Sequence, residues 1–293
     1  MRDSFSTYHP AVNFLYFCAV LLCCMFFMHP VFLVISFISA MLYSAALSGW
    51  KALRLCLLAF VPTLLLTTLI NALFNHAGVT VLLYVNDNPL TLESILYGAA
   101  FGLMFLTAIL WFSCYNAVMT SDKFIYLFGR VIPSLSLIFS MVLRFVPRFQ
   151  AQGKDIARAQ KCIGQDSKTG SVFIRAKRGM KLLSILTTWG LENAVDTADS
   201  MKARGYGLKG RTSFSLYRFD KRDSAALLTL AVLISLALTG WLLGESSLDY
   251  FPAITLESPS PLSLLFYVFY LLLCCYPLLL NLLYEIRWRR TQR

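Results

Sequence analysis

The sequence has few charged residues. Asp, Glu, Lys and Arg make up 14% of its 293 residues, whereas a soluble domain has about 25%. Hydrophobic residues make up 58%, and the mean hydropathy is +0.65. This composition excludes a cytosolic globular protein and a disordered protein, because so much apolar surface must be covered by lipid or by protein.

Ionisable residues are missing from the interiors of the apolar segments. Those nearest to them, Arg54, Glu93, Asp223 and Glu285, lie at segment ends, where we expect long side chains to reach the membrane surface. Ion and proton pathways use charged side chains deep in the membrane. A self-sufficient secondary transporter is therefore the weaker alternative for this chain.

Motifs for metal binding and catalysis are also missing. The three histidines lie far apart, no cysteine pair has metal-ligand spacing, and there is neither an H-E-x-x-H motif nor a G-x-x-x-x-G-K-[ST] phosphate loop. We therefore expect no metal and no cofactor in this chain, and no enzyme activity. A membrane-embedded lipid-modifying enzyme is the second alternative, for which Asp196 and Asp199 are the candidate acidic pair.

Six apolar segments are long enough to cross a membrane, which takes about 20 helical residues. A shorter apolar run, 131–146, contains Pro133 and predicts a tilted or partly embedded helix. The predicted fold class is all-α, a polytopic helical membrane protein. Four of the five tryptophans lie near segment ends, as expected of rings at headgroup depth. The six segments are approximately 11–28, 31–47, 53–73, 91–114, 225–243 and 262–284, and the tryptophans are Trp50, Trp111, Trp241 and Trp288.

Positive charge is concentrated in one stretch. Residues 144–222 hold 17 Lys and Arg against 6 Asp and Glu, whereas the loops 74–90 and 244–261 hold no Lys or Arg. Basic residues favour the cytoplasmic side, so we expect both loops outside and both termini inside. Anionic lipid is an expected partner of the basic stretch, and nucleic acid is not, because the basic residues are dispersed. The predicted regions are 1–120, N-terminal transmembrane helices; 121–222, a cytoplasmic or interfacial segment; and 223–293, C-terminal transmembrane helices with a basic tail.

The basic stretch contains two predicted amphipathic helices whose ends are alike. Each ends at a glycine, Gly164 or Gly205, and the pattern A-x-x-x-K-x-x-G recurs 41 residues apart, with Lys161 and Lys202 in it. Two similar helix tips indicate docking onto two similar sites, although basic residues and glycine also suit any helix end. The G-x-G-x-x-G pattern at 205–210 follows a predicted helix rather than a strand, so we interpret it as a helix stop.

A second small-residue pattern lies in an apolar segment. Gly98 and Gly102 are four residues apart, which allows two helices to approach closely. We expect this face to pack against another helix, in this chain or in a partner. The pattern says nothing about chemistry.

Several stretches together resemble the transmembrane coupling (T) component of energy-coupling factor (ECF) transporters, the family of vitamin and transition-metal importers that includes the cobalt-type permease subunits. The resemblance is strong over about 90–225 and extends to the N-terminal segments only in hydrophobic character. Its clearest part is 200–207, which reads SMKARGYG. The other stretches are 211–212, 217–221, 121–123, 132–134, 143–147 and 159–161.

The resemblance implies a function and a set of partners. T components carry two Ala-Arg-Gly motifs on cytoplasmic coupling helices, which dock onto two ATP-binding cassette ATPase subunits, while the membrane part holds a substrate-binding integral S component. ATP would then be hydrolysed on the partners, in the plasma membrane of a prokaryote, and a separate subunit would select the substrate. The second motif is intact as Ala203, Arg204 and Gly205, whereas the first corresponds to Cys162, Ile163 and Gly164, in which only the glycine is kept.

Overall fold

The computed structural model describes residues 3–85, 88–129, 132–166, 169–208, 217–244, 248, 250–252 and 261–291. Helices dominate this part of the chain, and four of them are long and apolar enough to span a membrane. The predicted all-α polytopic membrane fold is therefore confirmed. The helices are η1 (Phe5–Thr7), α1 (Pro10–Phe26), α2 (Pro30–Ser48), α3 (Trp50–Phe74), α4 (Leu92–Val118), α5 (Ser121–Gly129), α6 (Pro133–Cys162), α7 (Val172–Ala203), α8 (Lys221–Leu242) and α9 (Pro261–Thr291).

The chain divides into two compact units. Met1–Phe124 and Tyr217–Arg293 form the first, here called the bundle unit, and Ile125–Leu216 forms the second, the hairpin unit. The bundle unit contains the four candidate spans, which lie in α2, α4, α8 and α9, together with the shorter apolar helices Pro10–Phe26 and Phe60–Phe74. All six apolar segments of the sequence thus correspond to helices of the bundle unit.

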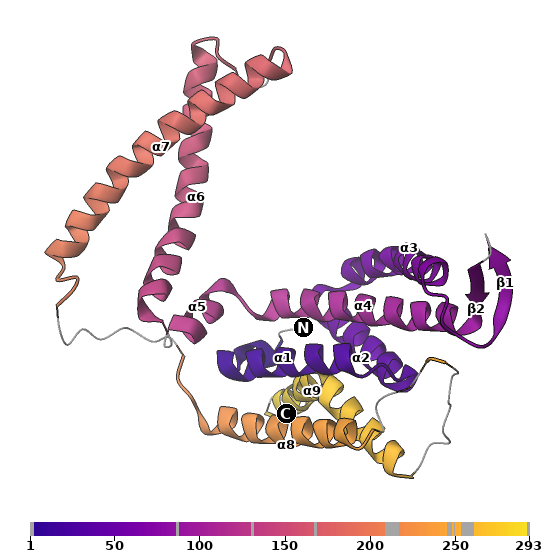
Figure 1. Cartoon of the computed structure of the whole chain (residues 1–293). Helices are drawn as coiled ribbons and strands as arrows, with labels where there is room; N and C mark the ends of the chain where they lie inside the picture. Colours follow the sequence, from indigo (N-terminus) through magenta and orange to yellow (C-terminus); the bar gives the residue numbers. More distant parts are fainter. Residues whose placement is uncertain are drawn as a thin grey trace. The chain divides into compact units, whose positions relative to one another are not determined.

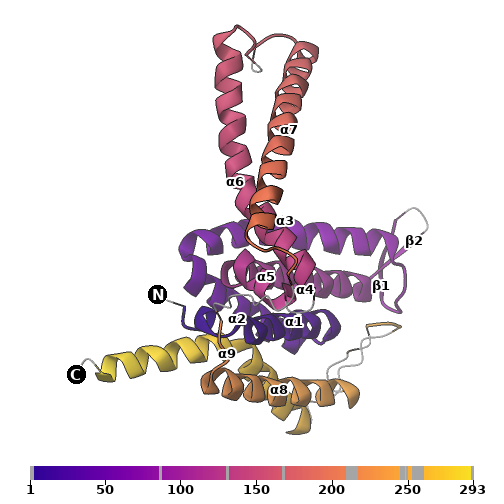
Figure 2. The ribbon, with the colours of Figure 1, turned by 90° about the vertical axis from the view of Figure 1, so that its left-hand side faces the viewer.

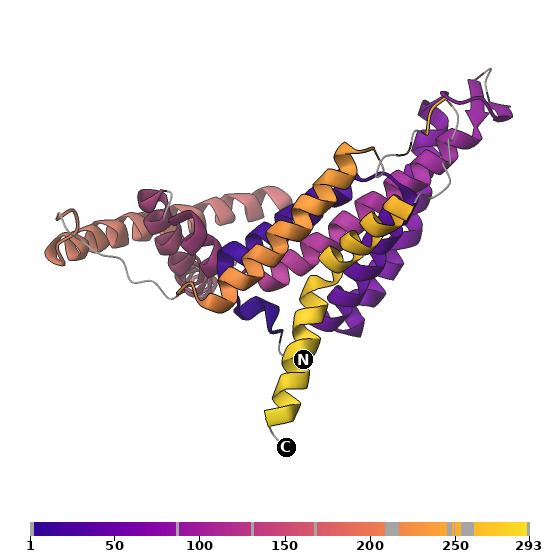
Figure 3. The ribbon, with the colours of Figure 1, turned by 90° about the horizontal axis from the view of Figure 1, so that it is seen from below.

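Helices α1 and α2 form the middle of the bundle unit. On one side α4 packs against both of them, with α3 beside α4; on the other side α8 packs against α1, and α9 against α2 (Figure 1). Figure 3 shows α8 and α9 next to each other, as their contacts require. Both middle helices begin at a proline, Pro10 or Pro30, which suits the first turn of a helix because its missing N–H needs no partner there.

Aromatic side chains fill the core of the bundle unit. Tyr16 lies 5.2 Å from Phe5 and 6.0 Å from Trp111 between ring centroids, and its hydroxyl donates to the Cys274 carbonyl at 2.9 Å. Trp111 is fully buried, and its indole N–H donates to the Ser36 hydroxyl at 3.0 Å. Trp111 is therefore a buried residue of the core, and its position at headgroup depth stays a prediction. Since α4 extends to Val118, this ring lies two turns inside the helix.

Two carboxylates at helix ends are buried instead of reaching outward. Asp223 is 3% exposed and accepts from the backbone N–H groups of His9 (3.2 Å) and Asp220 (3.1 Å). Glu93, also 3% exposed, accepts from the N–H of Thr80 at 3.2 Å. Both carboxylates therefore bind backbone donors inside the protein, so the expectation that they reach the membrane surface was wrong.

Gly98 and Gly102 face α3 within the same chain. A methyl group at Gly98 would lie 2.9 Å from the Thr68 Cα, and one at Gly102 would meet the Thr67 side chain. These two glycines thus allow the close contact between α3 and α4. A small antiparallel hairpin, β1 (Val81–Val85) with β2 (Asn88–Thr91), joins the two helices, and the sequence analysis did not predict it.

The hairpin unit consists mainly of α6 and α7, which run antiparallel and cross (Figures 1 and 2). The apolar run 131–146 is not a separate helix, because α6 continues from Pro133 through Pro147 to Cys162. The crossing is close: the Phe149 and Trp189 rings lie 5.3 Å apart, and a methyl group at Gly190 would lie 2.9 Å from the Phe149 Cζ. A side chain at position 190 would therefore have to displace the Phe149 ring.

Candidate functional site

The first predicted docking tip is the C-terminus of α6. Ile163 caps the helix, and Gly164 follows with a φ of 75°, a conformation that favours glycine. The N–H of Gly164 donates to the Lys161 carbonyl at 3.0 Å, and the N–H of Gln165 donates to the Gln160 carbonyl at 2.9 Å. These two bonds form a complete Schellman motif. Cys162 is exposed, and 63% of Ile163 is exposed.

The second tip, at the end of α7, repeats this geometry. Arg204 caps the helix, and Gly205 has a φ of 82°. The N–H of Gly205 donates to the Lys202 carbonyl at 2.9 Å, and the N–H of Tyr206 donates to the Met201 carbonyl at 3.1 Å. Each bond lies 41 residues after its counterpart in the first tip. The sequence repeat is therefore also a structural repeat, with Arg204 in the place of Ile163.

The two tips lie at opposite ends of the α6–α7 pair. Helix α6 runs from Pro133 to its tip, and α7 runs back in the opposite direction, so that its own tip lies at the other end of the pair (Figure 2). A helix of 30 residues is about 45 Å long, so the tips are separated by roughly that length. Lys161 and Lys202, one in each tip, are exposed. Lys202 forms a surface ion pair with Asp199 at 3.8 Å.

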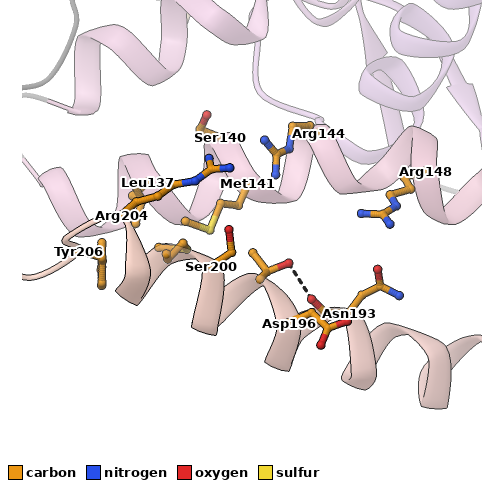
Figure 4. A pocket seen from close by; sticks show the side chains of 12 residues that line it. Leu137, Ser140, Met141, Arg144, Arg148, Asn193, Asp196, Ser200, Arg204 and Tyr206 are labelled. Atoms are coloured by element: carbon orange, nitrogen blue, oxygen red, sulfur yellow. Dashed lines mark hydrogen bonds between the residues drawn. The ribbon is translucent and has the colours of Figure 1, made fainter.

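Arg204 lines an open groove between α6 and α7. The groove has a volume of about 560 Å³, and its polar lining includes Arg144 and Arg148 of α6 as well as Ser140 and Ser200. Figure 4 shows Arg204 extending from the end of α7 toward α6, on the side where Arg144 lies. The full lining is Leu137, Ser140, Met141, Arg144, Arg148, Asn193, Asp196, Thr197, Ser200, Met201, Arg204 and Tyr206.

The groove carries excess positive charge. Three guanidinium groups face one carboxylate, Asp196, and in the described part of this unit the ion pairs involve other basic residues, Arg158 and Lys202. Arg148 lies over the Trp189 ring, 5.4 Å from its centroid, which holds its side chain in place. Sequence reasoning did not include Arg144 and Arg148 in the site. Their spacing of four residues, which places both on one face of a helix, could have indicated them.

The same two helices also form an apolar groove, which shares Met141, Asn193, Thr197 and Met201 with the arginine groove. This second groove, of about 320 Å³, is also lined by Phe145, Phe149, Ala194 and Ala198, among others. Successive helical residues lie about 100° apart, so the α6 residues that are apolar and exposed, such as Ile138 and Val142, point away from the arginine groove. The hairpin unit thus presents a cationic face and an apolar face.

The histidines do not gather into a metal site. His9 and His29 cap α1 and α2, each accepting through Nδ1 from an N–H two residues on, and His76 Nδ1 lies 3.3 Å from the Pro89 carbonyl. Among the described residues, no group of three His, Cys, Asp or Glu side chains could hold a metal ion. Asp196 and Asp199 lie on α7, where Asp196 lines the arginine groove and Asp199 pairs with Lys202.

The sequence matches a known family over most of its length. Residues 3–214 match the model of the cobalt transport protein family, CbiQ. The chain belongs to this family. The match covers the helices from α1 to α7, including both tips and the arginine groove.

Several curated relatives are named energy-coupling factor transporter transmembrane protein EcfT. The one from Listeria innocua is 33% identical over 184 residues, which cover 59% of this chain and 69% of the relative. The one from Lactobacillus helveticus is 33% identical over 113 residues, 38% of this chain and 41% of the relative. The one from Bacillus subtilis is 34% identical over 103 residues, 35% of this chain and 39% of the relative.

These names confirm the resemblance to the T component of ECF transporters. The chain is a multi-pass membrane protein of a transporter family, and these relatives are named as transporter components. The matched region spans only about two fifths of the Lactobacillus and Bacillus relatives. Substrate, partners and mechanism are therefore matters for proposal.

Proposed function

We propose that this chain is the transmembrane coupling subunit of an ECF-type importer. It transmits the ATP-driven motion of two partner ATPase subunits to a substrate-binding membrane subunit, for uptake of a vitamin or a transition metal. The observation that carries the proposal is the repeat of one exposed backbone motif at opposite ends of the α6–α7 pair. A chain of a transporter family with two such tips is suited to a pair of similar partner subunits.

The second tip is the stronger docking point in this proposal. Arg204 offers a planar fork of donors for a carboxylate or for carbonyl oxygens, and Ala203 is small enough for close approach. At the first tip, Cys162 and Ile163 supply only apolar contact. The positive charge of this tip is on Lys161, whose ammonium group is a point charge and not a planar fork of donors. Arg144 and Arg148, in the same groove as Arg204, favour an acidic surface on the ATPase at this end.

ATP binding and hydrolysis belong to the partners in this proposal, and no cofactor is assigned to this chain. The proposed location is the plasma membrane of a prokaryote. The distribution of Lys and Arg supports an orientation with both termini in the cytoplasm. Under this orientation the cationic face of the hairpin unit meets the ATPases. Anionic lipid headgroups are the other expected contact of its basic residues.

Affinity purification in mild detergent tests the proposal. The chain should bring along two ATPase subunits and a small membrane protein. Arg204→Glu should abolish this co-purification while membrane insertion stays normal, because a buried interface arginine contributes about 2 kcal/mol or more. Arg158→Glu is the matched control, since Arg158 is an exposed arginine of α6 outside the groove.

The size of the loss at each tip provides a second test. Ile163→Ala should weaken co-purification less than Arg204→Ala, because only the second tip has a charge-assisted donor at the cap position. Equal losses would contradict the asymmetry. Normal assembly of Arg204→Glu with both ATPases would refute the docking role, and a chain purified without any ATPase would favour a self-sufficient transporter.

A further inference from the structure

The N-terminal segment of the bundle unit, residues 3–9, contacts both points at which the chain passes between the units. The chain leaves the bundle unit after Phe124 and returns to it at Tyr217. These two points are 93 residues apart in the sequence. Side chains next to each of them bind the same short segment.

Lys123 binds the segment at the point of departure. It is 7% exposed, and its ammonium group donates to the carbonyls of Ser6 at 2.6 Å and Val118 at 2.9 Å. With the Asn13 amide oriented so that its nitrogen donates to the Phe5 carbonyl, the Asn13 oxygen accepts a third bond from Lys123 at 3.2 Å. Burial lowers the pKa of Lys123, and the nearby Asp3 carboxylate partly offsets this. A buried ammonium group is retained in a fold only when its donors are satisfied in this way.

Three side chains bind the same segment at the point of return. The Phe219 ring lies 5.2 Å from the His9 ring, and the Asp223 carboxylate accepts from the His9 N–H at 3.2 Å. The Arg222 guanidinium lies over the Tyr8 ring at 4.3 Å and donates to the Thr7 carbonyl at 3.3 Å. A cation over an aromatic ring and a charge-assisted hydrogen bond both favour one fixed geometry.

The segment is also anchored to α9. The Asn281 Oδ1 accepts from the N–H groups of Ser4 at 2.8 Å and Phe5 at 3.2 Å, and its Nδ2 donates to Asp3 at 2.7 Å. Phe5 is fully buried. The segment is therefore a fixed part of the bundle core and not a loose terminus.

We propose that residues 3–9 are a clamp that ties the departure point at Lys123 to the return point at Phe219–Asp223, with Lys123 and Arg222 as its positioning residues. The two connections to the hairpin unit then shift together and not independently. If the proposed function holds, this makes the bundle unit respond to the hairpin unit as one body. The clamp itself consists only of residues of this chain, so it does not depend on the proposed function or on the partner subunits.

Hydrogen–deuterium exchange of the full chain in lipid nanodiscs, without ATPases, tests the clamp. Lys123→Met keeps the length of the side chain and removes its donors. We expect exchange to become about tenfold faster not only at 118–124 but also at 217–224, because the loosened segment no longer holds Arg222 and Asp223. Lys221→Met is the matched control, since Lys221 is exposed on the same helix turn as Arg222, and it should change neither region.

The reciprocal variant keeps the test decisive if Lys123→Met does not fold. Arg222→Met removes an exposed side chain and should accelerate exchange at 118–124, on the other side of the clamp. Faster exchange confined to the neighbourhood of each mutated residue would overturn the proposal. Because no ATPase takes part, this result is independent of whether Arg204 docks onto one.

Discussion

The bundle unit and the hairpin unit differ in whether they have a buried core. In the bundle unit, Tyr16, Trp111, Leu230 and Leu273 are fully or almost fully buried, whereas none of the described residues of the hairpin unit is buried. The hairpin is held by one line of contact, along which Phe149 meets Trp189. A protein whose apolar faces stay open relies on lipid or partner subunits to cover them. The comparison therefore separates a unit that has a buried core from one that has none among its described residues, and both units expose apolar side chains.

The largest expected effect contrasts one tryptophan from each unit. Trp111→Ala should lower the free energy of unfolding by about 3–5 kcal/mol, because it leaves a cavity in the core. Trp189→Ala should cost about 1 kcal/mol, the contribution of a single aromatic pair. Chemical denaturation in detergent, followed by circular dichroism, measures both. Similar losses for the two variants would remove the distinction between the units.

A change at the helix crossing should have a medium effect confined to the hairpin unit. Gly190→Leu places a side chain against Phe149 and should destabilise the crossing by about 1–3 kcal/mol. Hydrogen exchange should accelerate in α6 and α7 and stay unchanged in α1 and α4. In Gly179→Ala the added methyl group meets nothing within 4 Å, so this variant should instead stabilise α7 by about 0.5–1 kcal/mol.

Replacing the glycine of either tip should have a smaller effect on stability, and the two effects should be nearly equal. Gly164→Ala and Gly205→Ala each force a side chain into a positive φ and should each cost about 1 kcal/mol, read as loss of exchange protection in the last helical turn. Gly205→Ala should be the worse of the two, because its methyl group would lie 3.0 Å from the Leu208 Cδ1, whereas nothing lies within 4 Å at Gly164. Gly153→Ala, inside α6, serves as the reference and should instead stabilise the helix by about 0.5–1 kcal/mol. An opposite order of the two tips would contradict this account.

The smallest effect concerns pH and the bundle unit. Burial lowers the pKa of His9, with Asp223 partly offsetting this, and burial also lowers the pKa of His29. As the pH decreases, these histidines therefore bind protons in the unfolded chain, near pH 6.5, before they do so in the folded protein. The free energy of unfolding should thus fall as the pH decreases from about 7 to 5. Protonation of His9 or His29 removes the acceptor that caps its helix, and the loss of each cap should lower the free energy of unfolding by about 0.5–1 kcal/mol.

A double variant isolates this pH effect. His9→Asn combined with His29→Asn keeps a capping acceptor at both helices and removes both titrating groups. Thermal unfolding in detergent should then become independent of pH between 7 and 5. An unchanged pH dependence in the double variant would show that other groups titrate.

The apolar segments and the glycine stops could be predicted from the sequence because each depends on local properties. Segment length and composition located α1 to α4, α8 and α9, and the position of Gly164 and Gly205 after the last helical turn located both tips. The continuity of α6 through Pro147 was missed. A proline inside a helix removes one hydrogen bond, which the rest of a 30-residue helix outweighs.

The errors concern contacts between residues far apart in the chain. The burial of Trp111 could not be predicted from its place near the end of an apolar segment, because its hydrogen-bond partner is Ser36 of α2. Asp223 is buried because it binds the His9 N–H, 214 residues away. The groove of Arg144, Arg148 and Arg204 exists only because α7 returns antiparallel along α6. Sequence patterns within one helix contain no information about such pairings.

The two tips have a consequence for symmetry. A pair of identical subunits presents the same surface twice, and the hairpin offers it two ends with the same backbone hydrogen bonds. One end carries Arg204 at the cap position and the other carries Ile163. Two identical subunits bound at these ends would become inequivalent, so a single pair of cap residues is enough to make a symmetric partner bind asymmetrically.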